Sequence, residues 1–202
     1  MKGRALLLFS VLVAGSARAE DFTLDVRFPT RVGFVYSGVT RGPAFSFSSA
    51  IEADVARVAP RVALTVFVDA DSTSRLDLPD QDPRAGFGNV GAGVGIFYVS
   101  RGSVAFGIES APSLAFDSQD VVGVGFSTRA TLFPFYVSFS EALDTRHDTF
   151  SAWVRSGISL WVLARVDFTA DGNGGSLGFG VSFDLARMLF MPYAQGVQKL
   201  FH

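Results

Sequence analysis

Hydrophobic and polar residues alternate along most of the chain after residue 20, with a period of two. Between Phe45 and Val55 the odd positions are mainly large and apolar, whereas the even positions are Ser, Ala, Glu and Asp. A period of two places successive side chains on opposite faces of an extended strand. This segment therefore predicts a β-strand with one apolar face and one polar face.

The same alternation recurs often enough to account for nearly the whole chain. It runs through residues 58–70, 90–98, 103–109, 122–132, 151–168 and 177–185, and a less regular piece surrounds Val32, Phe34 and Tyr36. Short segments rich in turn-forming residues separate these runs at 57–60, 100–103, 117–120 and 171–175, and one longer loop covers 72–86. We expect a meander of about eight strands, or ten if residues 22–28 before Pro29 form a strand of their own.

The composition of the polar face distinguishes a membrane barrel from a soluble β-domain. Gly, Ala and Ser dominate that face, together with a few charged residues of both signs, which suits a crowded interior better than a surface in water. We predict that these charged side chains form a polar network inside the barrel, while the large aliphatic residues face lipid and the sheet closes on itself. The predicted network contains Glu52, Asp54, Arg61, Asp69, Glu109, Arg129, Arg155, Arg165 and Asp184.

With this pattern the chain resembles the small outer-membrane β-barrels of Gram-negative bacteria, the class that includes the OmpA transmembrane domain and OmpX. The resemblance implies an all-β, closed, antiparallel, up-and-down transmembrane barrel in contact with outer-membrane lipid and lipopolysaccharide. It also implies the barrel-assembly machinery as a partner during biogenesis. Members of the class commonly end on an aromatic residue, whereas here Phe201 is followed by His202 and Pro192 interrupts the approach. We therefore expect residues 177–185 to be the final strand, with a short tail from about residue 187.

The first nineteen residues have the features of a cleaved signal peptide. Lys2 and Arg4 precede an apolar run over residues 5–14, and Ala17 and Ala19 form the small-residue pattern of a cleavage site. We expect Sec-type export, cleavage after Ala19 and a single barrel domain over residues 20–202. If the mature N-terminus starts in the periplasm, the segments 37–43, 72–86, 117–120 and 171–175 lie on the outer side.

Charge and cysteine content exclude several classes of function. Of the 202 residues only 18% are charged, and removal of residues 1–19 leaves 14 cations against 19 acids, a net charge of −5. Such a chain has no basic footprint for nucleic acid. It contains no Cys, so disulfides are impossible, and with only His147 and His202 a multi-histidine metal site is excluded. We expect no cofactor and no metal.

Three short motifs carry little chemical information. Residues 86–91 match G-x-G-x-x-G, but a dinucleotide site requires a following helix, and more glycines follow instead. Residues 171–175 lack the ligands of a calcium loop and are better explained as a glycine-rich hairpin. His147 lies near Asp144, Asp148 and Ser151, a spacing that is not diagnostic of a hydrolase, and we expect a solvated loop histidine.

These observations predict a non-enzymatic integral outer-membrane protein that is structural or presents surface loops, with at most a narrow channel. Two alternatives stay open at this point. One is a lipid-modifying outer-membrane barrel enzyme that uses His147. The other is a soluble periplasmic module that holds an apolar ligand as lipocalins do, in which case the aliphatic faces would point inward. The oligomeric state is not predicted.

Overall fold

The computed structural model describes residues 25–38, 42–76, 86–100, 104–116, 121–136, 157–170, 172–184 and 187–188. These residues form an antiparallel sheet whose strands follow one another in chain order. The strands are β1 (Val26–Arg27), β2 (Pro29–Ser37), β3 (Gly42–Ala59), β4 (Val62–Arg75), β5 (Gly86–Val99), β6 (Ala105–Phe116), β7 (Val121–Phe133), β8 (Ile158–Thr169) and β9 (Gly172–Asp184). No helix among the described residues is long and apolar enough to cross a membrane.

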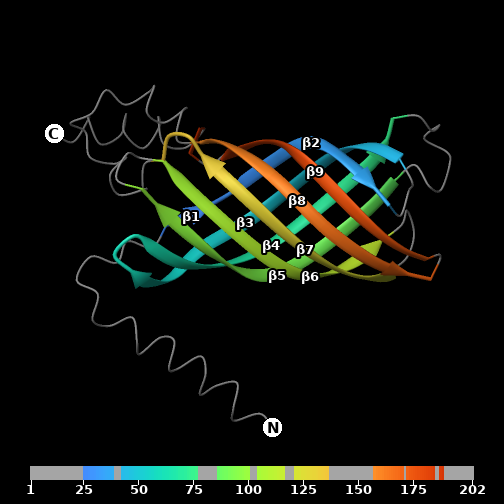
Figure 1. Cartoon of the computed structure of the whole chain (residues 1–202), viewed down its shortest axis with the longest axis horizontal. Helices are drawn as coiled ribbons and strands as arrows, with labels where there is room; N and C mark the ends of the chain where they lie inside the picture. Colours follow the sequence, from blue (N-terminus) through green and yellow to red (C-terminus); the bar gives the residue numbers. More distant parts are fainter. Residues whose placement is uncertain are drawn as a thin grey trace, which may run out of the picture.

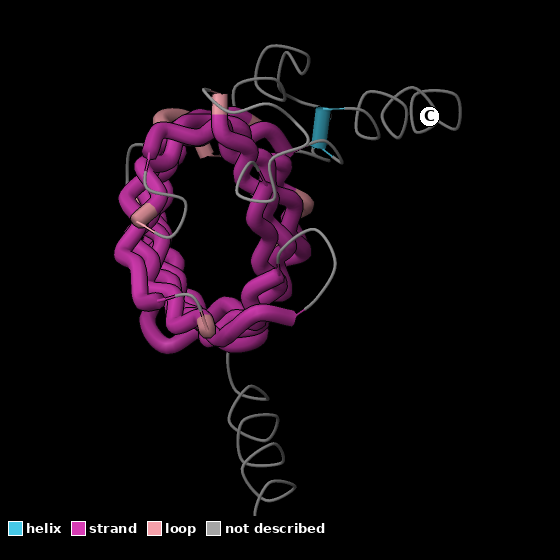
Figure 2. Tube along the Cα trace, turned by 90° about the vertical axis from the view of Figure 1, so that its right-hand side faces the viewer, coloured by secondary structure: helices cyan, strands magenta, loops and turns pink. Residues whose placement is uncertain are grey.

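The sheet closes into a barrel. From β2 to β9 each strand pairs with the next, and β2 pairs with β9, so that Pro29 lies opposite Asp184 and Ser37 opposite Ser176. The strands run obliquely along the length of the molecule in Figure 1, and Figure 2 shows them as a ring. The prediction of a closed, antiparallel, up-and-down all-β barrel is confirmed.

The ring contains eight strands, because β1 and β2 are two parts of one strand. Val26 lies opposite Ala53 and Thr30 lies opposite Ser49, so both parts follow the same register against β3. The interruption falls at Phe28 and Pro29, and proline has no N–H to donate to a ladder. The expectation of about eight strands is confirmed. Of residues 22–28, Val26 and Arg27 form β1, which continues the line of β2 and adds no further strand to the ring, and residues 22–24 lie outside the described residues.

Several strand boundaries differ from the sequence prediction: β4 continues to Arg75, into the expected loop 72–86, and β6 continues to Phe116, beyond the expected 103–109. The strand expected from residue 151 begins only at Ile158, after a turn at Gly157, and residues 151–156 lie outside the described residues. The final strand begins at Gly172 rather than Leu177, because Gly172 to Gly175 pair with β8 instead of forming the hairpin turn. Glycines without side chains gave no alternation in this segment, so its strand character was not visible in the hydrophobic pattern.

The two ends of the barrel are distinguished by the connections between strands. At the loop end, β2 joins β3, β4 joins β5, β6 joins β7 and β8 joins β9. The opposite end, here named the turn end, contains the two-residue turn at Pro60 and Arg61 and the start of β1. The strand ends that flank the segments 37–43, 72–86, 117–120 and 171–175 thus lie at one end of the barrel, as the predicted order of strands and connections requires. Their assignment to the outer side of a membrane stays a prediction, and so does the signal peptide, which lies outside the described residues.

The barrel wall turns its bulky apolar side chains outward. Ile51, Phe126 and Leu160 are 57%, 52% and 48% exposed, whereas the neighbouring Glu52 and Arg129 are 3% and 4% exposed. The same alternation of buried and exposed residues extends through the other strands of the ring. The expected orientation is therefore observed, and a soluble lipocalin-like module with an apolar interior is ruled out.

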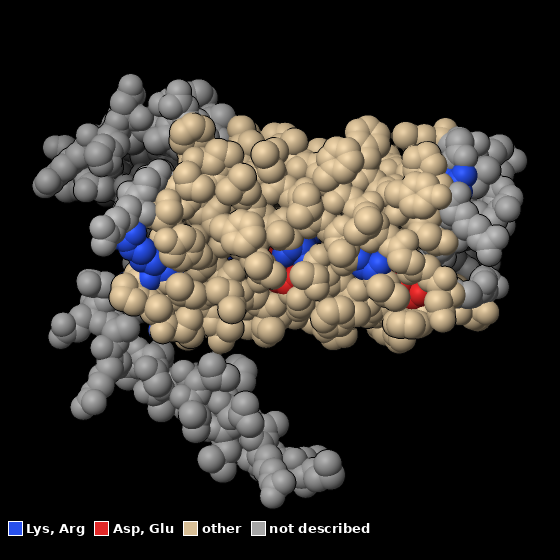
Figure 3. Space-filling view, viewed as in Figure 1, with Lys and Arg blue, Asp and Glu red and all other residues tan. Residues whose placement is uncertain are grey.

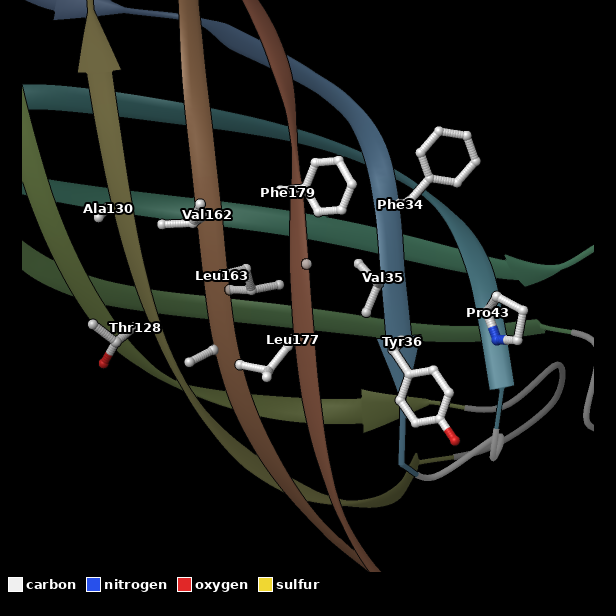
Figure 4. A pocket seen from close by; sticks show the side chains of 12 residues that line it. Phe34, Val35, Tyr36, Pro43, Thr128, Ala130, Val162, Leu163, Leu177 and Phe179 are labelled. Atoms are coloured by element: carbon white, nitrogen blue, oxygen red, sulfur yellow. The ribbon is translucent and has the colours of Figure 1, made fainter.

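Glycines on the inner face leave room for one large aromatic side chain. Trp161 of β8 is 3% exposed and lies over Gly33 of β2 and Gly180 of β9. A Cβ atom added to either glycine would come within 2.6 Å or 2.8 Å of the Trp161 ring. The Trp161 indole N–H donates to the backbone oxygen of Val181 at 3.2 Å, so its polar atom is satisfied. With Val35 and Leu163, which Figure 4 labels on β2 and β8, it forms a small apolar cluster inside the barrel.

Candidate functional site in the barrel interior

The interior contains nearly all of the charge that the described residues carry. Among them, only Arg57 and Arg61 are exposed charged residues, and both lie at the turn end. In Figure 3 the side wall is mostly tan, with small groups of blue and red atoms visible between the apolar side chains along its middle, and the largest group of blue atoms lies at the left end. The buried charged residues are Asp25, Arg27, Arg31, Glu52, Asp54, Asp69, Glu109, Arg129, Arg165, Asp167, Asp184 and Arg187.

Arg27 of β1 makes the densest set of contacts in this interior. Its Nε donates to Glu52 at 3.0 Å, and its two terminal nitrogens donate to the two carboxylate oxygens of Asp54 at 3.2 and 2.9 Å. The guanidinium group lies 4.1 Å from the ring centroid of Phe97. Bidentate pairing and stacking are both geometries that a planar guanidinium favours. Arg27 therefore ties β1 to β3 and β5.

A chain of ion pairs continues from Arg27 across the middle of the barrel. Glu52 accepts from Arg27 and also from Arg31 Nη2. Arg31 Nη2 lies 3.4 Å from Glu109, and Arg129 Nη1 lies 3.8 Å from the same carboxylate. Arg129 Nη2 donates to Asp69 at 3.0 Å. We name this chain of side chains from β1, β2, β3, β4, β6 and β7 the central cluster.

A second group of ion pairs lies closer to the loop end. Arg165 of β8 donates to Asp167 at 2.9 Å and to Asp71 of β4 at 2.6 Å, which places it across the barrel from its own strand. Its guanidinium carbon lies 5.8 Å from the Phe87 ring centroid. We name Arg165, Asp71 and Asp167 the loop-side cluster. Because it bridges β8 and β4, this cluster crosses the lumen.

The turn end is capped by residues that flank the strands. Asp25, which precedes β1, accepts from Arg187 Nη2 at 2.7 and 2.6 Å and from the hydroxyl of Tyr136. The backbone N–H of Arg187 donates to Asp184 at 3.1 Å. Burial raises the pKa of the Asp25 carboxyl above its usual 3.8, and the nearby Arg187 and Arg27 oppose this rise. We name Asp25, Tyr136 and Arg187 the end cap.

Aromatic rings pack directly beneath the end cap. Tyr136 makes edge-to-face contacts with Phe97 and Phe133, with ring centroids 4.9 and 5.8 Å apart. Arg187 lies 5.2 Å from the Tyr136 ring centroid, and Arg27 stacks on Phe97. Aromatic and cationic groups in these arrangements attract each other through the ring quadrupole. The turn end of the lumen is thereby filled by side chains that reach it from β1, β5, β7 and the segment after β9.

The structure brings together most of the side chains predicted for the polar network. Glu52, Asp54, Asp69, Glu109 and Arg129 take part in the central cluster or contact it, Arg165 belongs to the loop-side cluster, and Asp184 contacts Arg187 of the end cap. Arg61 does not join them, which corrects its predicted place: it is exposed in the turn between β3 and β4, where the alternation ends. Arg155 lies outside the described residues.

Several residues of the network were missed by the sequence analysis. Three of these residues are Asp25, Arg27 and Arg31, which occupy odd positions of the segment 25–33. Pro29 and Gly33 share those odd positions and obscured the period of two. Closer attention to alternate positions before and after Pro29 would have found them. Asp71 and Arg187 gave no such signal, because each lies near the end of a regular run and its partner is distant in the chain.

Metal binding and dinucleotide binding find no support among the described residues. No group of three or more His, Asp and Glu side chains that could hold a metal ion occurs among them. The glycines of the G-x-G-x-x-G match belong to β5, which is followed by another antiparallel strand rather than a helix, so the dinucleotide reading is not supported. His147 and the acids around it lie outside the described residues.

The fold and its interior define a class: a closed eight-stranded barrel with an apolar outside and an ion-paired inside. Comparisons with known proteins add similar structures but no family, since no family model and no curated protein matches the sequence. The chain is similar to Neisserial surface protein A (NspA), with 16% identity, a TM-score of 0.45 and coverage of 81% of this chain and 99% of that one. It is also similar to Ail, the attachment invasion locus protein of Yersinia pestis, whose structure was solved in complex with the heparin analogue sucrose octasulfate. There the identity is 8%, the TM-score 0.41 and the coverage 80% and 99%.

Proposed function

We propose that this protein is an integral outer-membrane β-barrel that does not conduct ions and acts as a structural or loop-presenting element. The observation that carries the proposal is the separation of side chains across the wall. Large apolar residues cover the outer face of the wall. The described charged residues, except those at the turn end, point into the barrel. Such a surface suits hydrocarbon, and a closed ring satisfies the backbone hydrogen bonds that lipid cannot.

The ion pairs support a sealed lumen rather than an open pore. The central cluster and the loop-side cluster both cross the barrel, and the end cap fills its turn end. In a barrel of eight strands the interior is just wide enough to be filled by side chains. We infer that contact with lipid and lipopolysaccharide, assembly by the barrel-assembly machinery and export by the Sec route accompany this role, and that the protein is not an enzyme.

Membrane location is tested by fractionation of cells that produce the full chain. We expect the mature protein in the outer-membrane pellet, with an electrophoretic mobility that changes on heating because the barrel unfolds. A variant without residues 1–19 is the matched control and should remain inside the cell. Recovery of the mature protein in the soluble periplasmic fraction would contradict the proposal.

The sealed lumen is tested by conductance in planar bilayers. We expect no ion current from the reconstituted protein under conditions in which a porin, inserted in parallel, gives steps. A steady conductance that falls when Arg129 is replaced by Ala would instead establish a narrow channel lined by the central cluster.

The enzymatic alternative is tested by the lipid composition of cells that produce His147→Ala. We expect this composition to be the same as in cells that produce the unchanged protein.

A further inference from the structure

A small void separates the central cluster from the loop-side cluster. It has a volume of about 10 Å³ and lies entirely among polar side chains of the inner face. Its lining consists of Asp69, Asp71, Asn89, Ser113, Ser127, Arg129 and Arg165. The void is thus lined both by Arg129 and Asp69 of the central cluster and by Arg165 and Asp71 of the loop-side cluster.

Buried polar atoms without partners occur on the residues that line this void. Arg129 Nε and Arg165 Nη2 donate no hydrogen bond, although these residues are only 4% and 3% exposed. The Asp71 oxygen Oδ1 and the Asn89 nitrogen Nδ2, which line the same void, also have no partner at normal hydrogen-bond distance. Buried polar groups in proteins are almost always hydrogen-bonded, to the protein or to ordered water. The site therefore requires a ligand that accepts from two guanidinium groups and donates to a carboxylate.

The size and charge of the site select among possible ligands. A volume of about 10 Å³ corresponds to roughly one water-sized sphere. An anion would satisfy the arginines but would lie against the carboxylates of Asp69 and Asp71, and a metal cation would lie against the two guanidinium groups. Water has two lone pairs and two hydrogens, so it can accept from both guanidinium groups and donate to the Asp71 carboxylate. The remaining donor, Asn89 Nδ2, interacts with Asp71 directly.

We propose that one long-lived water molecule binds in this void, accepts hydrogen bonds from Arg129 Nε and Arg165 Nη2, and donates one to Asp71 Oδ1. The water joins the central and loop-side clusters into one continuous polar plug. This inference deepens the proposed sealed lumen, on which it rests, because it explains how two separate groups of ion pairs close a single barrel. A water held by several hydrogen bonds is part of the structure rather than mobile solvent.

The site is tested by nuclear magnetic resonance of the folded full chain in detergent micelles. We expect cross-relaxation from a long-lived water to the Arg129 Nε–H and to the Asn89 side-chain amide. In Ser127→Val the larger side chain fills the void, and both signals should fall at least fivefold. Ser48→Val is the matched control, because Ser48 is a buried inner-face serine that does not line the void, and it should retain both signals. Loss of the heat-modifiable mobility in Ser127→Val would mean that this variant does not fold. In that case Ser113→Thr provides the same test, because it adds only one methyl group to the lining of the void.

Three results would overturn the proposal. The first is a wild-type protein without long-lived water signals at Arg129 and Asn89. The second is an equal loss of these signals in Ser48→Val and Ser127→Val. The third is a saturable shift of the Arg129 Nε–H resonance when chloride replaces gluconate, which would identify an anion instead. Conductance of the same preparations separates this inference from the proposed function. A barrel that conducts ions but shows the water signals refutes only the proposed sealed lumen. A barrel that does not conduct and lacks the water signals refutes only the proposed bound water.

Discussion

The inner and outer faces of the barrel are built from the same strands yet obey opposite rules. On β3, Ile51 is 57% exposed and Glu52, one residue later, is 3% exposed. A soluble β-barrel shows the reverse arrangement, because its core must exclude water. Here the charged groups form the packed interior and the apolar groups form the surface. The outer face is therefore suited to surroundings that are less polar than the barrel interior. The contribution of each face to stability can be tested separately.

The largest effect is expected from removing the guanidinium group of Arg27. Arg27→Leu leaves Glu52 and Asp54 without their main partner, and breaking a buried ion pair costs about 3–5 kcal/mol. We expect a loss of this size in the free energy of unfolding, measured by urea titration in lipid vesicles. Arg61→Leu, at an exposed position, should change it by less than about 0.5 kcal/mol. Equal effects of the two substitutions would show that the inner network does not stabilise the barrel.

The outer face is tested by placing a charge on it at two positions along the barrel. Val68 lies near the middle of β4 and is 55% exposed. Val68→Arg should cost about 2–4 kcal/mol in vesicles, as an arginine at the bilayer midplane does. Val58→Arg, close to the turn end of β3, should cost about 0–1 kcal/mol because an arginine there reaches the interface. If Val68→Arg were neutral, the outer face would not contact hydrocarbon.

A smaller effect is expected where the inner face depends on glycine. In Gly33→Ala the new methyl group would lie 2.2 Å from the Phe179 backbone oxygen and 2.6 Å from Trp161, so the wall must shift. Overpacking of this kind costs about 1–3 kcal/mol. Gly86→Ala is the control, since nothing lies within 4 Å of the added atom. The unfolding midpoints of the two variants in urea should differ accordingly, and a stable Gly33→Ala would mean that Trp161 is not held against this wall.

The smallest effect is expected at the end cap. Tyr136→Phe removes the hydroxyl that donates to Asp25 but keeps the ring contacts with Phe97 and Phe133. The loss of one such hydrogen bond should lower the free energy of unfolding by about 0.5–1.5 kcal/mol. Tyr98→Phe, on the outer face, is the matched control and should cost less. An unchanged free energy of unfolding in Tyr136→Phe would show that this hydrogen bond does not stabilise the barrel.

The strands and their faces were predictable because they depend on local alternation. Phe45 to Val55, for example, shows its outer and inner positions directly, and the structure places them accordingly. The partners inside the barrel were not predictable in the same way. Arg165 pairs with Asp71, 94 residues earlier, and Arg187 pairs with Asp25, 162 residues earlier. Nothing in the neighbourhood of either arginine indicates its partner, since the closure of the ring sets both contacts.

The alternation in the sequence is enough to show that the wall is a sheet with one large apolar face and one face of small or ionic residues, because a period of two is a local property of extended backbone. The ion-pair partners and the exposed position of Arg61 became visible only in the folded barrel. The same holds for Arg187, which follows β9 and caps the barrel by pairing with Asp25. The physical reason is that these contacts depend on strand register and closure around the ring, and both are set by all eight strands together.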